Sequence, residues 1–403
     1  MLPPEARAAQ LILAMVTTPE VAQKALDDGI VGGFALKGNQ SKDIGSSVAA
    51  TVKDAPITPF VASDEEGGTV QRLRLALGDL PAAATVAKGT SEEAAKTAGE
   101  HAKGMKQLGF NVNFAPVADV GSGAGLGTRS YGSDPATVSS FVDAVFPAIS
   151  DAGVMPVVKH WPGIGGGSAD PHQQVTKLAP IDTLRTKDLI PFEDAIAKGA
   201  PAIMVTHAEV PGLTARGEPA SLSSAAITGE LRGREGFTGL VFTDSLGMGA
   251  ITQLGSQTDA AEKAIAAGAD VAMISGVDVA PAVHARLVDA MTTGRIPADQ
   301  VLASVRRVLA AKGVEGPCLD AVARYSALAR SGSTVSSTAP GATASSTPTT
   351  VGTAGAGTTP SRMTTTSRPT TSRPTTTSSV TTTSRPTTTS SVTTTTVVAG
   401  VNG

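Results

Sequence analysis

The chain has 403 residues, a formal net charge of −3 and a single cysteine, Cys318. One cysteine excludes an intrachain disulfide and a CxxC metal or redox site. The slightly acidic balance argues against a nucleic-acid partner. No apolar run reaches about 18 residues, so the sequence predicts no membrane span.

The composition changes at about residue 331. In residues 331–403, 41 of the 73 positions are Ser or Thr, with four Arg, no acid and no Lys. The motif Arg-Pro-Thr-Thr-Thr-Ser-Ser-Val begins at Arg373 and again at Arg385. This segment has too few apolar residues to offset the entropy of ordering its backbone. We predict a disordered tail, which is either a glycosylated or wall-spanning stalk or an unmodified extension.

The remaining body, residues 1–330, carries 28 basic and 35 acidic groups, a net charge of −7. Short apolar runs recur along it with helix-like stretches between them. Runs of this length and composition are typical of parallel strands covered on both faces. The predicted strands are Leu11–Val16, Gly32–Leu36, Pro59–Ala62, Asn111–Pro116, Met155–Lys159, Ala202–Thr206, Leu240–Thr243 and Val271–Ile274.

Two intervening stretches illustrate the helical pattern. Residues 91–108 begin with Ser91 as the predicted N-cap, have acids in the first turn and end before Gly109. Residues 182–198 end in the same way before Gly199. The repeated strand–helix alternation predicts a parallel α/β fold. Its count of about eight favours a single-domain (β/α)₈ TIM-type barrel over an open sheet.

Polar residues cluster at the C-terminal ends of these runs. In a barrel all such ends open on one face, where enzymes of this fold place their active sites. The residues concerned are Asp64, Glu65, Asp119, Lys159, His160, His207, Asp244 and Ser275.

Residues 157–172 are the richest segment for chemistry. Lys159 and His160 end a strand, and the glycine-rich stretch Gly163–Gly167 predicts a mobile loop. Asp170 lies two residues before His172, a spacing that lets a carboxylate orient an imidazole for acid–base work. The competing interpretation is a surface loop with a solvated Asp and His.

Two further segments are candidates. The strand 240–243 leads directly into Asp244, which is either a nucleophile or cation stabiliser, or simply the N-cap of a following helix. Residues 64–72 combine three acids, two glycines and Arg72, which can hold ligand hydroxyls or form an acidic turn with a surface ion pair.

The other histidines give weaker signals. His101 and His284 fall in helix-like stretches, where solvated or packing roles are expected, and His207 stays open. No HxH or HExxH pattern occurs, so the sequence predicts no metal site.

Taken in order, these segments resemble glycoside hydrolase family 3, and most closely its single-domain β-N-acetylhexosaminidase branch. The resemblance covers about residues 8–315. The matching segments are DEEGGTVQR (64–72), NFAPVAD (113–119), RSYG (129–132), KHWPGIG with DPH (159–172), PASLS (219–223) and TDSLGM (243–248).

The resemblance implies a retaining hydrolase that needs no metal or cofactor. Asp244 falls on the nucleophile of the family, His172 on the general acid/base of this branch, and Asp170 on its partner. The implied substrate is a terminal N-acetylglucosamine of peptidoglycan-derived fragments, and the implied state is a monomer. The positions that hold the sugar fall on Asp64, Arg72, Arg129, Lys159 and His160.

Among the departures of this chain from the family pattern, three affect the proposed catalytic residues or their neighbours. Ile164 replaces a loop histidine, Pro171 lies between Asp170 and His172, and Ser245 replaces a second aspartate after the nucleophile. The nucleophile and acid/base positions remain, which favours an active enzyme. Two alternatives stay open: β-glucosidase-type specificity on the same chemistry, and a catalytically silent sugar-binding wall protein.

The sequence gives two conflicting indications of location. The first residues lack the basic and apolar regions of a signal peptide, which by itself indicates the cytoplasm. The Ser/Thr-rich tail is instead typical of an exported or cell-envelope protein. We favour the envelope, on the hypothesis that the true start lies upstream of Met1.

Overall fold

The computed structural model describes residues 2–170 and 172–314. These residues belong to one compact unit. The predicted tail, its boundary at residue 331, Cys318 and Pro171 lie outside the described residues.

Every predicted run forms a strand, and the fifth run is interrupted at Val157 to give two short strands. Their backbones are almost entirely buried, as expected for strands covered on both faces. The strands are β1 (Ile12–Val16), β2 (Gly33–Leu36), β3 (Phe60–Ser63), β6 (Val112–Asn113), β7 (Met155–Pro156), β8 (Val158–Trp161), β10 (Ala202–Val205), β12 (Leu240–Thr243) and β13 (Ala272–Ser275).

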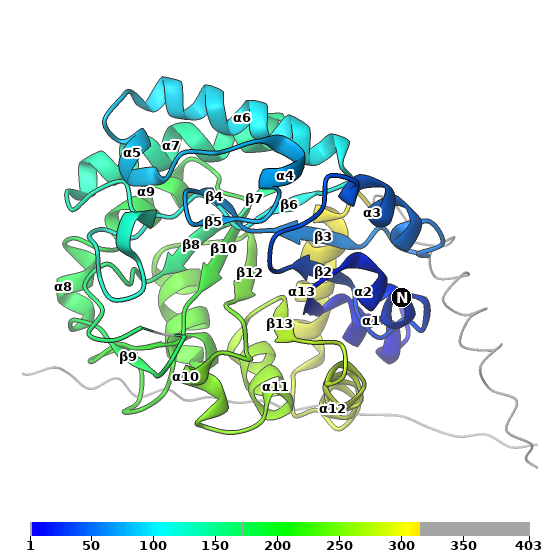
Figure 1. The fold of residues 1–403 in the computed structure, drawn as a ribbon. Helices are drawn as coiled ribbons and strands as arrows, with labels where there is room; N and C mark the ends of the chain where they lie inside the picture. Colours follow the sequence, from blue (N-terminus) through cyan, green and yellow to red (C-terminus); the bar gives the residue numbers. More distant parts are fainter. Residues whose placement is uncertain (1, 171, 315–403) are drawn as a thin grey trace, which may run out of the picture. The chain divides into compact units, whose positions relative to one another are not determined.

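These strands form two parallel sheets, with the orders β13-β1-β2-β3-β6-β7 and β12-β10-β8. Neighbouring strands follow the chain order, without the reversal that characterises doubly wound open sheets. The last strand pairs with the first, with Ile12 opposite Ala272, and a single bridge between Phe242 and Val271 joins β12 to β13. The C-terminal ends of the strands therefore lie close together (Figure 1).

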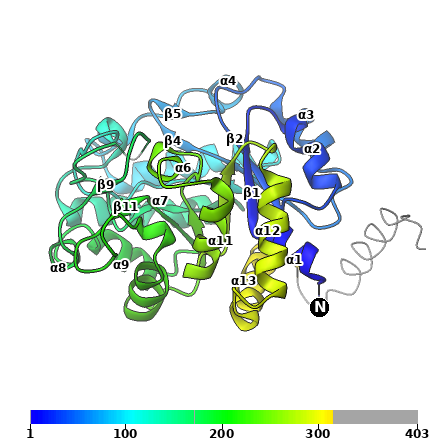
Figure 2. The same ribbon diagram turned by 90° about the horizontal axis from the view of Figure 1, so that it is seen from below.

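Helices lie around the outside of the strands (Figure 1). The α-helices are α1 (Pro4–Gln10), α2 (Pro19–Asp27), α3 (Ile44–Val52), α4 (Arg74–Leu77), α5 (Ala83–Val86), α6 (Ser91–Gln107), α7 (Pro135–Asp151), α8 (Ile181–Arg185), α9 (Ile190–Ala197), α10 (Gly249–Thr252), α11 (Gln257–Ala267), α12 (Ala280–Thr292) and α13 (Ala298–Ala311). The 3₁₀ turns η1 (Gly127–Arg129) and η2 (Ala220–Leu222) and the π-helix η3 (Ala225–Arg234) complete the helical elements. Helix α1 contacts both α12 and α13, so the first and last described helices adjoin (Figure 2).

Two helix predictions need correction. Thr90, not Ser91, caps α6: its hydroxyl accepts from the amide of Glu93, whose carboxylate in turn accepts from the Thr90 amide. The predicted helix 182–198 is two helices, α8 and α9. Pro191 stands in the first turn of α9, where its missing N–H costs nothing, and it cannot continue a helix begun upstream.

Two short strand pairs lie outside the main sheets. β4 (Glu65–Gly67) and β5 (Val70–Gln71) form an antiparallel hairpin, where the sequence suggested only a turn. β9 (Thr176–Lys177) and β11 (Ala208–Glu209) pair in parallel after the long loop that follows β8. Both pairs follow the C-terminal ends of main strands.

Aromatic rings fill the space between the two sheets. Phe242 on β12 lies 5.9 Å from both Phe60 on β3 and Phe114, measured between ring centroids. Lys159 lies 6.0 Å from the Phe114 ring on one side, and Lys312 lies 4.6 Å from the Phe60 ring on the other. The core is therefore solid below the strand ends, which leaves the space above them for a ligand.

Asp270, immediately before β13, forms buried ion pairs whose contribution to the stability of the fold can be tested. Its fully buried carboxylate accepts hydrogen bonds from Arg232, from Arg307 and from the Val241 amide, and so links η3, α13 and β12. We expect Asp270→Ala to lower the free energy of unfolding by about 3–5 kcal/mol, because two cations lose their partner. Urea denaturation measures this loss.

The control is Asp28→Ala, which removes the exposed pair with Lys24 on α2. Exposed pairs contribute about 0–1 kcal/mol, so this variant should unfold close to the wild-type midpoint. Equal losses in the two variants would contradict the assignment of Asp270.

Candidate active site

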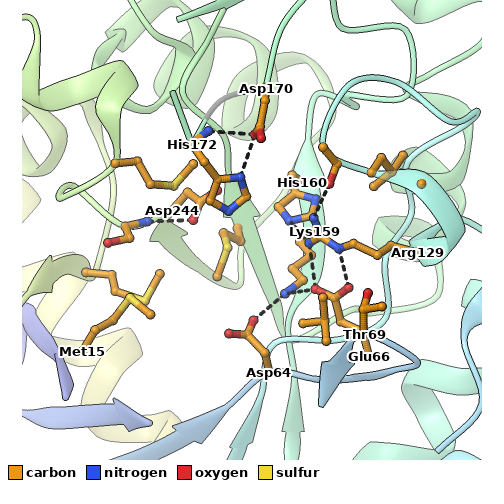
Figure 3. A pocket seen from close by; sticks show the side chains of 18 of the residues that line it. Met15, Asp64, Glu66, Thr69, Arg129, Lys159, His160, Asp170, His172 and Asp244 are labelled. Carbon is orange, nitrogen blue, oxygen red and sulfur yellow. Dashed lines mark hydrogen bonds and ion pairs between the residues drawn. The ribbon is translucent and has the colours of Figure 1, made fainter. Parts of the chain in front are cut away.

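All the residues that the sequence singled out for binding or catalysis line one cavity at the strand ends, with a volume of about 780 Å³. It holds Asp64, Arg72, Arg129, Lys159, His160, Asp170, His172 and Asp244. Glu66 and several methionines, including Met15, line it as well (Figure 3).

A buried ion cluster forms one wall of the cavity. The Lys159 ammonium lies 2.7 Å from an oxygen of Asp64 and 2.5 Å from an oxygen of Glu66. Arg129 donates two hydrogen bonds to Glu66, from Nε at 2.7 Å and from a terminal nitrogen at 2.9 Å (Figure 3). Arg72 approaches the second oxygen of Asp64 at 3.5 Å. The interpretation of residues 64–72 as a surface ion pair is therefore wrong.

The cluster keeps its groups charged. Burial alone would raise the pKa of Glu66, but Lys159 and Arg129 outweigh it and lower that pKa to about 2. Burial alone would lower the pKa of Lys159, yet Asp64 and Glu66 raise it above the ordinary value for lysine. The wall therefore carries charged groups that can donate hydrogen bonds to the hydroxyl groups of a polar ligand and accept hydrogen bonds from them.

His160 is held on both sides of its ring. Its Nδ1 lies 2.7 Å from Oδ2 of Asp119, and its Nε2 lies 3.1 Å from a terminal nitrogen of Arg129. Since Arg129 can only donate, Nε2 accepts and the proton resides on Nδ1, which donates to Asp119. The other oxygen of Asp119 accepts from the amides of His160 and Ile164. His160 therefore lines the cavity as a tightly positioned neutral ring.

The loop after β8 brings a second pair into the cavity. Nδ1 of His172 lies 2.7 Å from Oδ1 of Asp170, which also accepts from the His172 amide at 3.0 Å. Burial alone would raise the pKa of Asp170, but the bonds from His172 keep it below the usual carboxyl range. Nδ1 donates to the carboxylate, and Nε2 of His172 has no hydrogen-bond partner among the residues that the structure describes, so it can exchange a proton with a ligand. The hydrogen bond agrees with the acid–base interpretation, while the His172 side chain is 61% exposed and so also remains in contact with solvent.

Close backbone packing places this loop. A Cβ atom at Gly125 would lie 2.6 Å from Oδ1 of Asp170. Another at Gly249 would lie 2.4 Å from the carbonyl oxygen of Gln173, and the Gly249 amide donates to the His172 carbonyl. Ile164 is buried with Val117 and Leu126 in a small apolar cluster beneath the loop.

Asp244 follows β12 directly and is buried. Its Oδ1 accepts from the Ser245 amide at 2.7 Å. Burial alone would raise the pKa of Asp244, but the hydrogen bond from the Ser245 amide and the charge of the Lys159 ammonium hold it below the usual carboxyl range. The next helix begins only at Gly249, with Met248 as its N-cap. The alternative that Asp244 or Ser245 caps a helix is therefore wrong.

His207, left open by the sequence, supports the turn after Asp244. Its Nε2 donates to the Ser245 carbonyl at 2.9 Å, and Ser221 donates to its Nδ1 at 2.7 Å. Burial lowers the pKa of His207, which favours this neutral form. The PASLS segment thus reaches the site through Ser221. The Ser245 hydroxyl bonds the hydroxyl of Ser275 at 2.9 Å instead of supplying a second carboxylate.

Sequence reasoning included Glu66 only as one of the three acids in residues 64–72 and did not assign it to the site, and it missed the role of Asp119 in fixing His160. Alternation along an extended strand could have identified Glu66, because residues two apart face the same side and Asp64 already pointed to the cavity. Of the two remaining histidines, His284 is half-buried and donates to the Glu5 carbonyl, whereas the His101 side chain is only 8% exposed and bonds Glu65 at 2.9 Å. Within the described ranges, no group of His, Cys, Asp and Glu is arranged to hold a metal ion, and no helix is long and apolar enough to span a bilayer.

Comparison with known proteins identifies the family. The model for the glycosyl hydrolase family 3 N-terminal domain matches residues 5–311. Beta-hexosaminidase LpqI of Mycobacterium tuberculosis is 37% identical over 330 residues, which are 79% of this chain and 85% of that protein. A beta-hexosaminidase of Xylella fastidiosa is 34% identical over 259 residues, 62% of this chain and 77% of that protein.

Comparison with solved structures indicates the same family. A family 3 glycosyl hydrolase from Mycobacterium smegmatis superposes with a TM-score of 0.74 at 38% identity, covering 78% of this chain and 98% of the other. A family 3 beta-N-acetylglucosaminidase from a Paenibacillus species also gives 0.74, at 30% identity, covering 80% of this chain and 64% of the other. The chain belongs to glycosyl hydrolase family 3. Its fold is a TIM-barrel-type α/β fold, and the predicted family is confirmed.

The ion cluster predicts a pH-dependent contribution of Glu66 to stability. Its pKa in the folded state, about 2, lies below its ordinary value of 4.5, so the contribution is complete above about pH 5 and is lost as the pH falls toward 2. We expect Glu66→Gln to cost about 3 kcal/mol at neutral pH and progressively less at lower pH. Urea denaturation at a series of pH values measures the difference from the wild type.

Glu100→Gln serves as the control, because Glu100 is an exposed residue within α6. Its difference from the wild type should stay small at every pH. A Glu66→Gln difference that does not shrink with acidification would refute the linkage.

Proposed function

We propose that this protein is a retaining exo-β-N-acetylglucosaminidase, which removes terminal non-reducing N-acetylglucosamine from peptidoglycan-derived fragments. One observation carries the proposal. An isolated buried carboxylate, an Asp–His pair with a free ring nitrogen, and a charged wall suited to sugar hydroxyls all line the same cavity. Its relatives are named beta-hexosaminidase and beta-N-acetylglucosaminidase.

In this proposal Asp244 is the nucleophile. Its lowered pKa keeps it ionised, and its single backbone hydrogen bond leaves an oxygen to attack the anomeric carbon. The attack breaks the glycosidic bond and forms a covalent glycosyl-enzyme, which water then hydrolyses with overall retention of configuration. The Lys159 ammonium stays charged and balances the carboxylates around it.

His172 is the proposed general acid and base. In the first step Nε2 protonates the departing glycosidic oxygen, and in the second it takes a proton from the attacking water. The hydrogen bond from Nδ1 to Asp170 fixes the ring orientation and stabilises the imidazolium form, which donates its proton in the first step and is regenerated in the second.

We assign the sugar hydroxyls and the N-acetyl group to Asp64, Arg72, Arg129 and Lys159. Within the part of the chain that the structure describes, Nε of Arg72 has no hydrogen-bond partner, so this guanidinium retains a donor for a ligand. His160 also lines the space, but both of its ring nitrogens are already bonded. We therefore assign it to positioning Arg129.

The proposal extends to the architecture. We infer that the strands close into one (β/α)₈ barrel, supported by the pairing of β13 with β1 and by the bridge from β12 to β13. We also propose a monomer with its catalytic domain in residues 1–330, most of which the matching family model covers.

A panel of aryl glycosides tests the activity. The wild type should release p-nitrophenol from the β-N-acetylglucosaminide and little from the β-glucoside. Asp244→Ala should lower kcat by about 10³-fold or more, and His172→Ala by about 10²-fold, since each removes a group that acts in the chemical steps. Activity on the glucoside alone would indicate glucosidase specificity, and activity on neither substrate would indicate a silent sugar-binding protein.

A second variant tests how the Asp170–His172 pair is positioned. Gly125→Ala places a methyl group against the Asp170 carboxylate, so we expect it to shift the pair and lower kcat about 10- to 100-fold. Gly127→Ala is the matched control: Gly127 also has a positive φ, of 55°, but a Cβ there meets no heavy atom within 4 Å. Similar losses in both variants would show that backbone strain, not the contact with Asp170, is responsible.

A further inference from the structure

Glu65 is a buried acid that the proposed mechanism does not use. Its neighbours in sequence, Asp64 and Glu66, line the large cavity, whereas Glu65 faces the opposite side of the hairpin. Its side chain is 0% exposed. A carboxylate buried this deeply needs several hydrogen bonds to offset its lost hydration, so its partners show what it does.

One carboxylate oxygen of Glu65 joins the two ends of the hairpin. Oε1 accepts from the Ser63 hydroxyl at 2.9 Å, from the Arg72 amide at 2.8 Å and from the Leu73 amide at 3.0 Å. Ser63 immediately precedes Asp64. These bonds therefore set the separation between the backbones of Asp64 and Arg72, whose side chains meet at 3.5 Å in the cavity.

The other oxygen ties the hairpin to a helix. Oε2 lies 2.9 Å from Nε2 of His101, which projects from α6 and is 8% exposed. Helix α6 has 17 residues and an N-terminal capping box, so it is a stable support. The space beside the pair is a cavity of about 40 Å³, which has room for little more than one water molecule and none for a sugar.

We propose that Glu65 and His101 form a positioning pair, which holds Asp64 and Arg72 at the spacing that the sugar requires. Neither residue touches the substrate; both act through the hairpin. The inference depends on one part of the proposed function, namely that the hairpin binds a sugar.

A double-mutant cycle tests the pair. His101→Leu should lower kcat/KM about tenfold, mainly through a higher KM, because Asp64 and Arg72 would hold the sugar in the ground state and the transition state alike. In an Arg72→Ala background the same change should lower kcat/KM less than about twofold, because the group it positions is already gone. His101→Gln, whose amide can still donate to Glu65, should stay within about threefold of the wild type.

The matched control is His284→Leu, which replaces a half-buried histidine on α12 that donates to the backbone carbonyl of Glu5. It should leave kcat and KM unchanged. An equal tenfold loss from His101→Leu in both backgrounds, or no recovery in His101→Gln, would overturn the inference and leave His101 a purely structural residue. If His101→Leu does not fold, His101→Asn, which is too short to reach Glu65, replaces it in the cycle.

Hydrogen exchange separates this inference from the proposed function. The amides of Arg72 and Leu73 donate to Glu65, so His101→Leu should speed their exchange relative to amides in β1, whereas His101→Gln should not. If the wild type hydrolyses no glycoside, the proposed function fails, yet this measurement still decides whether His101 fixes the hairpin. Unchanged exchange at both amides would overturn the pair.

Discussion

The site depends on one buried cation, the ammonium group of Lys159. An ammonium that is 2% exposed is tolerated only because Asp64 and Glu66 lie within hydrogen-bond distance of it. Those two acids come from the segment after β3, while Lys159 comes from β8, so the ion pairs tie together parts of the chain that are distant in sequence. Arg129 adds a third segment by bonding Glu66. The ion pairs that form the charged wall of the cavity therefore also hold these three segments of the chain together.

The carboxylates of the cavity fall into two kinds, according to whether a cation lies within hydrogen-bond distance of them. Asp64 and Glu66 are paired with cations and suit the recognition of hydroxyl groups. Among the described residues, the Ser245 amide is the one hydrogen-bond partner of Asp244, so its charge is not neutralised there by a cation at close range. A carboxylate that is ionised but not committed to a counterion is what nucleophilic attack at an anomeric carbon requires. The proposed division between sugar binding and chemistry follows from these environments.

The departures from the family pattern fit this structure. Ile164 replaces a polar loop residue and packs with Val117 and Leu126, while its amide binds Asp119. The apolar side chain thus anchors the base of the loop that carries His172. Ser245 replaces a second acid and bonds Ser275. The site consequently has no second carboxylate beside Asp244 that would raise its pKa by repulsion.

The sequence by itself determined the strands and the face on which they converge, because buried parallel strands are continuous apolar runs and their C-terminal ends share one face. It also singled out eight residues of the cavity, but it did not assign Glu66 to the site. Motifs local in sequence, such as Asp170 with His172, could also be recognised. Tertiary structure alone decided the partners: Glu66 with Lys159 and Arg129, Asp119 with His160, and Glu65 with His101. These contacts join residues 36 to 93 positions apart, and spacing along a chain carries no information about which distant side chains meet. The long-range pairing of charges therefore had to be seen in the folded protein.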